Sequence, residues 1–164
     1  MLKYCNNPNG FIKPDEWRTI EKNLQQENYL DHDQSVVVKI GKDMRVLIES
    51  HYSTKDVVDI LSTLTFRYNH TNYDDQLFRA EFIKLENTVY RVKGSTSVVH
   101  KTCPFHNLDI DDNDRKFLHN RYEVFNMTTK TSIVFTALDL HMLECHEFLN
   151  NQIPIDVLLD VLKT

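Results

Sequence analysis

The stretch LFRAEFIKLENTVYRV, residues 77–92, predicts a pair of antiparallel strands and with it the class of fold. Residues 77–85 and 88–92 are rich in apolar, β-branched and aromatic side chains, which is typical of strands. Glu86-Asn87 between them is short enough for a tight turn, and strands joined by a tight turn pair in antiparallel fashion. An antiparallel sheet is therefore the expected centre of the fold.

Upstream of this pair, the sequence predicts a helix, a hairpin and a mixed segment. Pro14 and the acidic residues after it favour a helix start, and the apolar spacing predicts a helix from about 14 to 27. Residues 35–48 carry two β-branched runs around a glycine-bearing turn and predict a β-hairpin. After the cap-like Ser53 we expect a short helix, which gives way to a strand over residues 64–68.

Downstream, the pattern changes from strands to helices. Val98-Val99 predicts a strand at the end of the sheet, and residues 132–138 predict another. Helices are expected over residues 115–125, 139–150 and 154–162. The order predicts an α+β fold with an N-terminal helix, a mostly antiparallel sheet and C-terminal helices, in a single domain over residues 1–164.

Composition narrows the classes of function. A chain of 164 residues with 41% hydrophobic residues has no apolar run near the ~20 residues that span a membrane, and no secretory signal is visible. We therefore expect a cytoplasmic protein with no membrane span. The net charge of −5, with acids and bases interspersed, predicts protein partners and no nucleic acid. The three cysteines are widely spaced and are interpreted as free thiols.

Cys103 is the leading candidate for a reactive residue. It follows a short apolar run and lies close to His100 and Lys101, and neighbouring cationic groups favour the thiolate form. Pro104 cannot continue a strand ladder, so we expect the strand to open into an exposed loop at this point.

A metal site is the first alternative interpretation of the same region. Cys103 and His106 form a CxxH pair, and His141 and Cys145 form an HxxxC pair on one predicted helical face. Together they are a conceivable zinc tetrad. Helix amphipathicity explains the second pair equally well and no glycine-rich knuckle is present, so the sequence favours a core position for Cys145 and no metal.

A phosphoesterase is the second alternative. The pairs His51-Tyr52-Ser53 and His100-Lys101-Thr102 match the HxS/T pattern with which two-histidine phosphoesterases place a general acid and a general base around a phosphate. Such short patterns are common in a chain with eight histidines. This hypothesis requires both histidines in one cleft.

Four stretches follow one another in a recognisable order: the N-terminal helix with Asp15-Glu16-Trp17, the predicted hairpin at 35–48, Tyr73 before Leu77-Phe78-Arg79-Ala80, and Gly94-Ser95 leading through His100 to Cys103. In this order they resemble the autophagy E2-like conjugating enzymes of the autophagy-related protein ten type, which are similar to ubiquitin-conjugating enzymes. The segment 114–125 resembles the helix that follows the family's active cysteine. The family's usual signature is His-Pro-Cys, whereas this chain has His100-Lys101-Thr102-Cys103, with Pro104 after the cysteine.

The resemblance implies an E2-like fold and a defined transfer reaction. Cys103 would accept a ubiquitin-like modifier as a thioester from an E1-like activating enzyme, and a lysine of an acceptor protein would then attack the thioester. His100 would favour the thiolate, and Tyr73 would stabilise the oxyanion or orient the lysine. The transfer step needs no metal and no diffusible cofactor. The competing hypothesis from another class is a non-catalytic α+β protein-interaction module.

Overall fold

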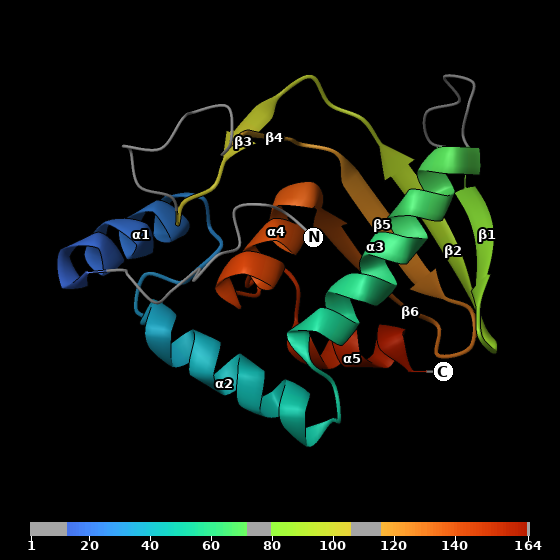
Figure 1. The fold of residues 1–164 in the computed structure, drawn as a ribbon, viewed down its shortest axis with the longest axis horizontal. Helices are drawn as coiled ribbons and strands as arrows, with labels where there is room; N and C mark the ends of the chain where they lie inside the picture. The colour runs from blue at the N-terminus through green and yellow to red at the C-terminus, as the bar shows by residue number, and fades with distance from the viewer. Residues whose placement is uncertain (1–12, 72–79, 106–115, 164) are drawn as a thin grey trace.

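The structure, a computed structural model, describes residues 13–71, 80–105 and 116–163 and confirms the α+β class (Figure 1). Three helices precede the strands in the described chain, and two follow them. The elements are α1 (Pro14–Gln26), α2 (Val36–Glu49), α3 (Thr54–Thr71), β1 (Ala80–Leu85), β2 (Thr88–Ser95), β3 (His100–Thr102), β4 (Lys116–Leu118), β5 (Arg121–Asn126), β6 (Thr131–Thr136), α4 (Ala137–His146) and α5 (Ile155–Leu162).

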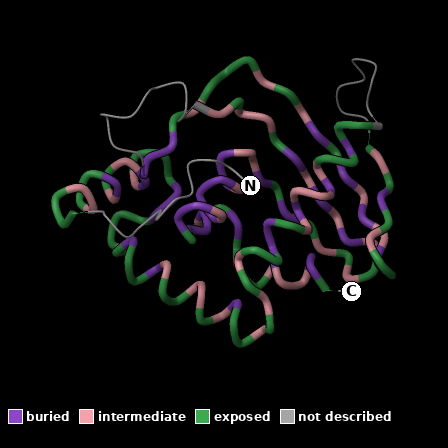
Figure 2. The backbone as a smooth tube through the Cα atoms, viewed as in Figure 1, coloured by how far each residue is buried: buried purple, intermediate pink, exposed green. Residues whose placement is uncertain are grey.

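The main sheet is antiparallel throughout, with strand order β1-β2-β5-β6. The short strands β3 and β4 pair with each other in a separate two-stranded sheet. Side chains alternate between two faces along each strand of the main sheet. Tyr90, Val92, Val124 and Phe135 are buried on the inner face, whereas the residues between them are exposed or half-buried (Figure 2).

The described helices all lie on one side of the main sheet, against its inner face (Figure 1). α3 packs on β1 and β2, and α5 packs on β5 and β6, so that a first hydrophobic core lies between sheet and helices. A second core lies beside it, where α1 and α4 meet the end of β3; its members include Leu24, Met142 and Phe148. No helix of the described residues is long and apolar enough to cross a membrane.

The predicted hairpin over residues 35–48 is wrong, because this segment forms the single helix α2. Ser35 caps its N-terminus by accepting a hydrogen bond from the Val38 amide. Buried and half-buried positions recur at 36, 39, 40, 43, 44 and 47, which is a helical spacing. Packing of this stripe therefore outweighs the strand preference of the β-branched run.

The predicted strand over residues 64–68 is also wrong, because α3 continues through it to Thr71. Val57, Leu61, Leu64 and Tyr68 are buried along one stripe of the helix. Their spacing of three to four residues fits one helical face, which the local alternation over residues 64–68 concealed.

The predicted helix over residues 115–125 is replaced by strands. β4 and β5 occupy this segment, and Tyr122, Val124 and Asn126 alternate as buried residues along β5. Val98 and Val99 precede β3 instead of forming a strand of the main sheet. The predicted elements at 14–27, 88–92, 132–138, 139–150 and 154–162 are confirmed with small shifts of their ends. The strand predicted over residues 77–85 is confirmed over its described part, 80–85, and residues 77–79 lie outside the described residues.

Gly94 in β2 is a position where the core tolerates no side chain. A Cβ atom there would lie 2.6 Å from Cε1 of Tyr68 and 3.3 Å from Cδ1 of Tyr122. We predict that Gly94→Ala destabilises the fold by about 1–3 kcal/mol, because the buried ring of Tyr68 must move. Urea unfolding measures this loss.

Gly41 provides a matched control for this substitution. It lies in the middle of α2, and a Cβ atom there would meet nothing within 4 Å. Gly41→Ala should stabilise the protein by about 0.5–1 kcal/mol, since alanine favours a helix interior. Equal effects of the two alanines would contradict the packing described for Gly94.

Candidate metal centre

Cys103 lies at the end of β3 and points into the second hydrophobic core. Its thiol is not in a disulfide, and the residue is only 2% exposed. The expected exposed loop at this position is therefore wrong. β3 pairs with β4, and the chain then turns inward, so that Cys103 and Phe105 are both buried among apolar side chains. The thiol of a cysteine buried in this way contacts groups in the interior of the protein and not solvent.

Two buried histidines on α4 face the same core. α4 begins with a capping box, in which the Thr136 side chain accepts from the Asp139 amide and Asp139 accepts from the Thr136 amide. The helix is buried on nearly every side, which brings both His141 and His146 into the interior. It ends at Glu147, whose backbone is left-handed with φ of 55°.

The ligand atoms of Cys103, His141 and His146 all lie within 4.8 Å of one another. The Sγ atom of Cys103 lies 3.7 Å from Nε2 of His146. A tetrahedral zinc ion, with bonds of about 2.3 Å to sulfur and about 2.0–2.1 Å to nitrogen, holds such ligands about 3.6 Å apart. The spacing of the sulfur and the nitrogen therefore fits a shared metal ion.

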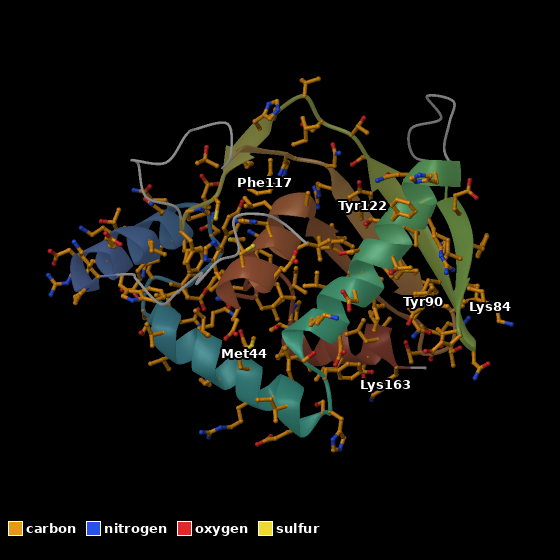
Figure 3. All side chains as sticks on the ribbon, viewed as in Figure 1. Met44, Lys84, Tyr90, Phe117, Tyr122 and Lys163 are labelled. Atoms are coloured by element: carbon orange, nitrogen blue, oxygen red, sulfur yellow. The ribbon has the colours of Figure 1, made fainter. Side chains whose placement is uncertain are left out.

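Aromatic side chains enclose the two imidazole rings. Phe105 stacks on His146 with ring centroids 4.3 Å apart and an interplanar angle of 7°. Phe117, from β4 and labelled in Figure 3, packs against His141 with ring centroids 4.5 Å apart. The two imidazoles meet edge to face at 5.3 Å. These contacts limit the rotation of both rings and bury them among apolar side chains, and a low-dielectric environment strengthens any electrostatic bond inside it.

Anionic charge is poorly solvated around this cluster. Burial, followed by the charges of Asp139, Glu27 and Cys103, raises the pKa of Tyr29 to about 12. Burial also raises the pKa of Asp139, although hydrogen bonds from Asn150 and Thr136 oppose the change. A thiolate in the same core needs a compensating cation, and a bound metal ion supplies one.

The zinc tetrad, which the sequence offered as an alternative and did not favour, agrees with the structure in part. Cys103 and His141, one residue from each of its two pairs, lie together in the cluster. Cys145 is fully buried on α4 but is disulfide-bonded, so it is neither a free thiol nor a member of the cluster. His106 lies outside the described residues. His146 replaces Cys145, and its only signal in the sequence is its place next to Cys145 in the last turn of the helix.

Of the residues expected for transferase chemistry, the structure describes Cys103 and His100, and these two differ in exposure. His100 is exposed on β3, whereas Cys103 is buried three residues later. The neighbouring Lys101 pairs with Glu27, with Nζ and Oε2 3.5 Å apart. Tyr73 lies outside the described residues. Among the described residues, the His146 imidazole contacts the thiol.

The histidines expected for a phosphoesterase belong to distant parts of the fold. His51 follows the C-terminal end of α2, and His100 lies in β3. These two elements are at opposite sides of the molecule (Figure 1). We do not carry this hypothesis further.

Comparisons with family models, with curated proteins and with solved structures found no match to this chain.

Proposed function

We propose that this protein is a metal-binding α+β domain in which Cys103, His141 and His146 hold one transition-metal ion. The observation that carries the proposal is the meeting of three buried ligand atoms, within 4.8 Å, from two segments far apart in the chain. A thiolate with two imidazoles is a donor set typical of Zn²⁺. A fourth ligand, from water or a side chain, completes the tetrahedron.

The role we propose for the ion is structural. Catalytic zinc sites keep one position open to substrate, whereas this cluster lies beneath the rings of Phe105 and Phe117 in the second core. The ion would join the end of β3 to α4 and so fix the two-stranded sheet to the body of the protein. Binding free energy of such a site becomes folding free energy.

Cobalt substitution tests the proposal. Metal-free protein titrated with Co²⁺ should bind one equivalent and develop the visible absorption of tetrahedral Co²⁺, together with a sulfur-to-metal charge-transfer band in the near ultraviolet. Zn²⁺ should displace it. Cys103→Ser should abolish the charge-transfer band, and His146→Ala should weaken binding by about 10-fold or more, because each removes a ligand.

His100→Ala is the matched control, since His100 is an exposed histidine three residues from the thiol. It should leave the spectrum and the stoichiometry unchanged. Absence of stoichiometric binding, or equal weakening by His100→Ala and His146→Ala, would count against a centre built on the buried cluster.

The E2-like transferase is the second candidate, and the order of N-terminal helices, antiparallel sheet and C-terminal helices favours it. In this proposal Cys103 carries the modifier as a thioester, assisted by His100 and Tyr73, and the partners are an E1-like enzyme, a ubiquitin-like modifier and an acceptor lysine. The 2% exposure of Cys103 opposes it, because the modifier's carboxyl end must reach the sulfur. We rank it below the metal centre for this reason.

A charging reaction separates the two candidates. The protein is mixed with an autophagy E1-like enzyme, its modifier and ATP, and is analysed on a non-reducing gel. A reductant-sensitive adduct that is lost in Cys103→Ser would support the transferase. No adduct, with a cobalt spectrum as described above, would leave the metal-binding domain as the function.

A further inference from the structure

The outer face of the main sheet, which the described helices leave uncovered, has an unusual composition. Antiparallel register and strand alternation place one set of side chains on this face. All of them are exposed or half-buried, whereas their neighbours along each strand lie against the helices. We call this set the open face; it includes Phe82 and Lys84 of β1, Val89, Arg91 and Lys93 of β2, Arg121, Glu123 and Phe125 of β5, and Val134 of β6.

The open face is basic, although the chain as a whole is acidic. Its charged strand residues are the four cations Lys84, Arg91, Lys93 and Arg121, and the single carboxylate Glu123. The Glu123 carboxylate lies 3.9 Å from Arg91 and offsets part of this charge. The net charge of the chain is −5. The alternation of side chains along the strands therefore gathers cations on one face, although acids and bases are interspersed in the sequence. This face suits a negatively charged partner.

A row of three planar side chains crosses the open face. Phe82 is the register partner of Arg91, and Arg91 is the register partner of Phe125. The Arg91 guanidinium lies 4.8 Å from the centroid of the Phe125 ring. Phe82 is 64% exposed. Adjacent strands are about 4.8 Å apart, so Phe82 lies next to Arg91, whose guanidinium in turn lies over the Phe125 ring, and the row offers planar groups on which unpaired bases stack.

Positive charge flanks this row on both sides. Lys84, labelled in Figure 3, is exposed on the edge strand β1, two residues from Phe82 on the same face. On the other side, a depression of about 190 Å³ is lined by Lys93, Arg121, Glu123 and Val134, among others. Stacking groups with cations on either side are the arrangement by which proteins bind single-stranded nucleic acids: bases stack on the planar groups, and phosphates meet the cations.

We infer that the open face binds single-stranded nucleic acid, with Phe82, Arg91 and Phe125 as the stacking row and Lys84, Lys93 and Arg121 as the phosphate contacts. An acidic peptide would contact the cations but would leave the exposed ring of Phe82 without a contact. Preferred binding of such a peptide would replace this inference. The inference does not depend on the metal centre, which lies in the second core on the other side of the sheet.

Fluorescence anisotropy with a labelled oligothymidylate of about 12 nucleotides tests the inference on the full chain. Binding should weaken with salt, with a slope of log affinity against log salt of about −2 for the three phosphate contacts. Phe82→Ala should weaken binding by about 5- to 150-fold, the loss expected for one stacked base. Lys93→Ala should lower the magnitude of the salt slope by about 0.7.

Matched controls come from α3, outside the open face. Phe66 is 61% exposed, close to the exposure of Phe82, and Lys55 is an exposed cation. Phe66→Ala and Lys55→Ala should leave the affinity within about 2-fold of the unsubstituted protein. Far-ultraviolet circular dichroism and thermal unfolding confirm that each variant is folded, which is expected for such exposed side chains.

Three results would overturn the inference. The first is no binding at low salt by the folded protein. The second is equal weakening by Phe82→Ala and Phe66→Ala. The third is equal affinity for the oligothymidylate and for an acidic peptide of the same charge, together with no effect of Phe82→Ala on either affinity. That result would assign the open face to acidic proteins.

Discussion

Removal of the metal ion should lower the midpoint of thermal unfolding by about 8–16 °C. A ligand present at about 1,000 times its dissociation constant stabilises a protein by about 4 kcal/mol. In a chain of this size each kcal/mol corresponds to about 2–4 °C. The physical reason is that the proposed ion joins the end of β3 to α4 inside the second core, and metal-free protein loses this cross-link. Scanning calorimetry with and without a chelator measures the change.

Substitution of the ligands should remove the effect of the chelator rather than add to it. Cys103→Ser and His146→Ala should each have a lowered unfolding midpoint that no longer responds to chelation. Comparing loaded and metal-free forms within each variant separates the loss of metal from the loss of packing. His100→Ala should keep the full chelator effect. A chelator shift of equal size in Cys103→Ser and in the unsubstituted protein would rule out Cys103 as a ligand.

Asn126→Ala should lower the free energy of unfolding by about 3–4 kcal/mol, because several buried polar groups lose their partners together. Asn126 is 0% exposed at the end of β5. Its Nδ2 donates to the carbonyls of Val161 and Lys163, at 2.8 and 2.9 Å. Its Oδ1 accepts from the amides of Thr128 and Thr129. One side chain thus joins the β5–β6 turn to the C-terminal end of α5, and urea unfolding measures its loss.

Two further variants identify the cause of this loss. Asn126→Asp keeps the acceptor for the turn but places a carboxylate against the carbonyls that end α5, which raises the pKa of the new carboxyl. A raised pKa in the folded state means that this variant gains stability as the pH falls through that pKa. Thr128→Ala removes an exposed side chain in the same turn and should cost less than about 0.5 kcal/mol. A loss in Thr128→Ala equal to that in Asn126→Ala would contradict the assigned contacts.

Local patterns were sufficient where one signal dominated. The Glu86-Asn87 turn between alternating runs predicted β1 and β2, and the Pro14 start predicted α1. They failed where two signals competed. The β-branched residues of 35–48 favour strands, but the helical stripe that includes Val36 and Leu47 packs against the rest of the protein and decides the outcome. Secondary structure at such positions depends on contacts that local sequence does not contain.

Like the secondary structure, the candidate site was predictable only where a local pattern was sufficient. Spacing identified Cys103 and His141 as a possible pair, because a CxxH and an HxxxC pattern both suit metal ligands. It could not show that the turn after β3 directs Cys103 inward, nor that the last turn of α4 brings His146 to the sulfur. A cysteine that is reactive on an exposed loop and a cysteine that binds a metal ion in a core can have the same neighbouring residues in the sequence.

By itself the sequence determined the α+β class, the antiparallel pair of strands β1 and β2, and the helices α1, α4 and α5. It also determined which residue types are available for metal binding. These features follow from local periodicity and composition. Only the tertiary structure decided that Cys103 is buried beside His146 and that Lys84, Arg91, Lys93 and Arg121 share one face with Phe82. The physical reason is that burial and the grouping of charges depend on which distant segments pack together. In this chain, packing buries the Cys103 thiol and places a basic open face on a protein whose net charge is −5.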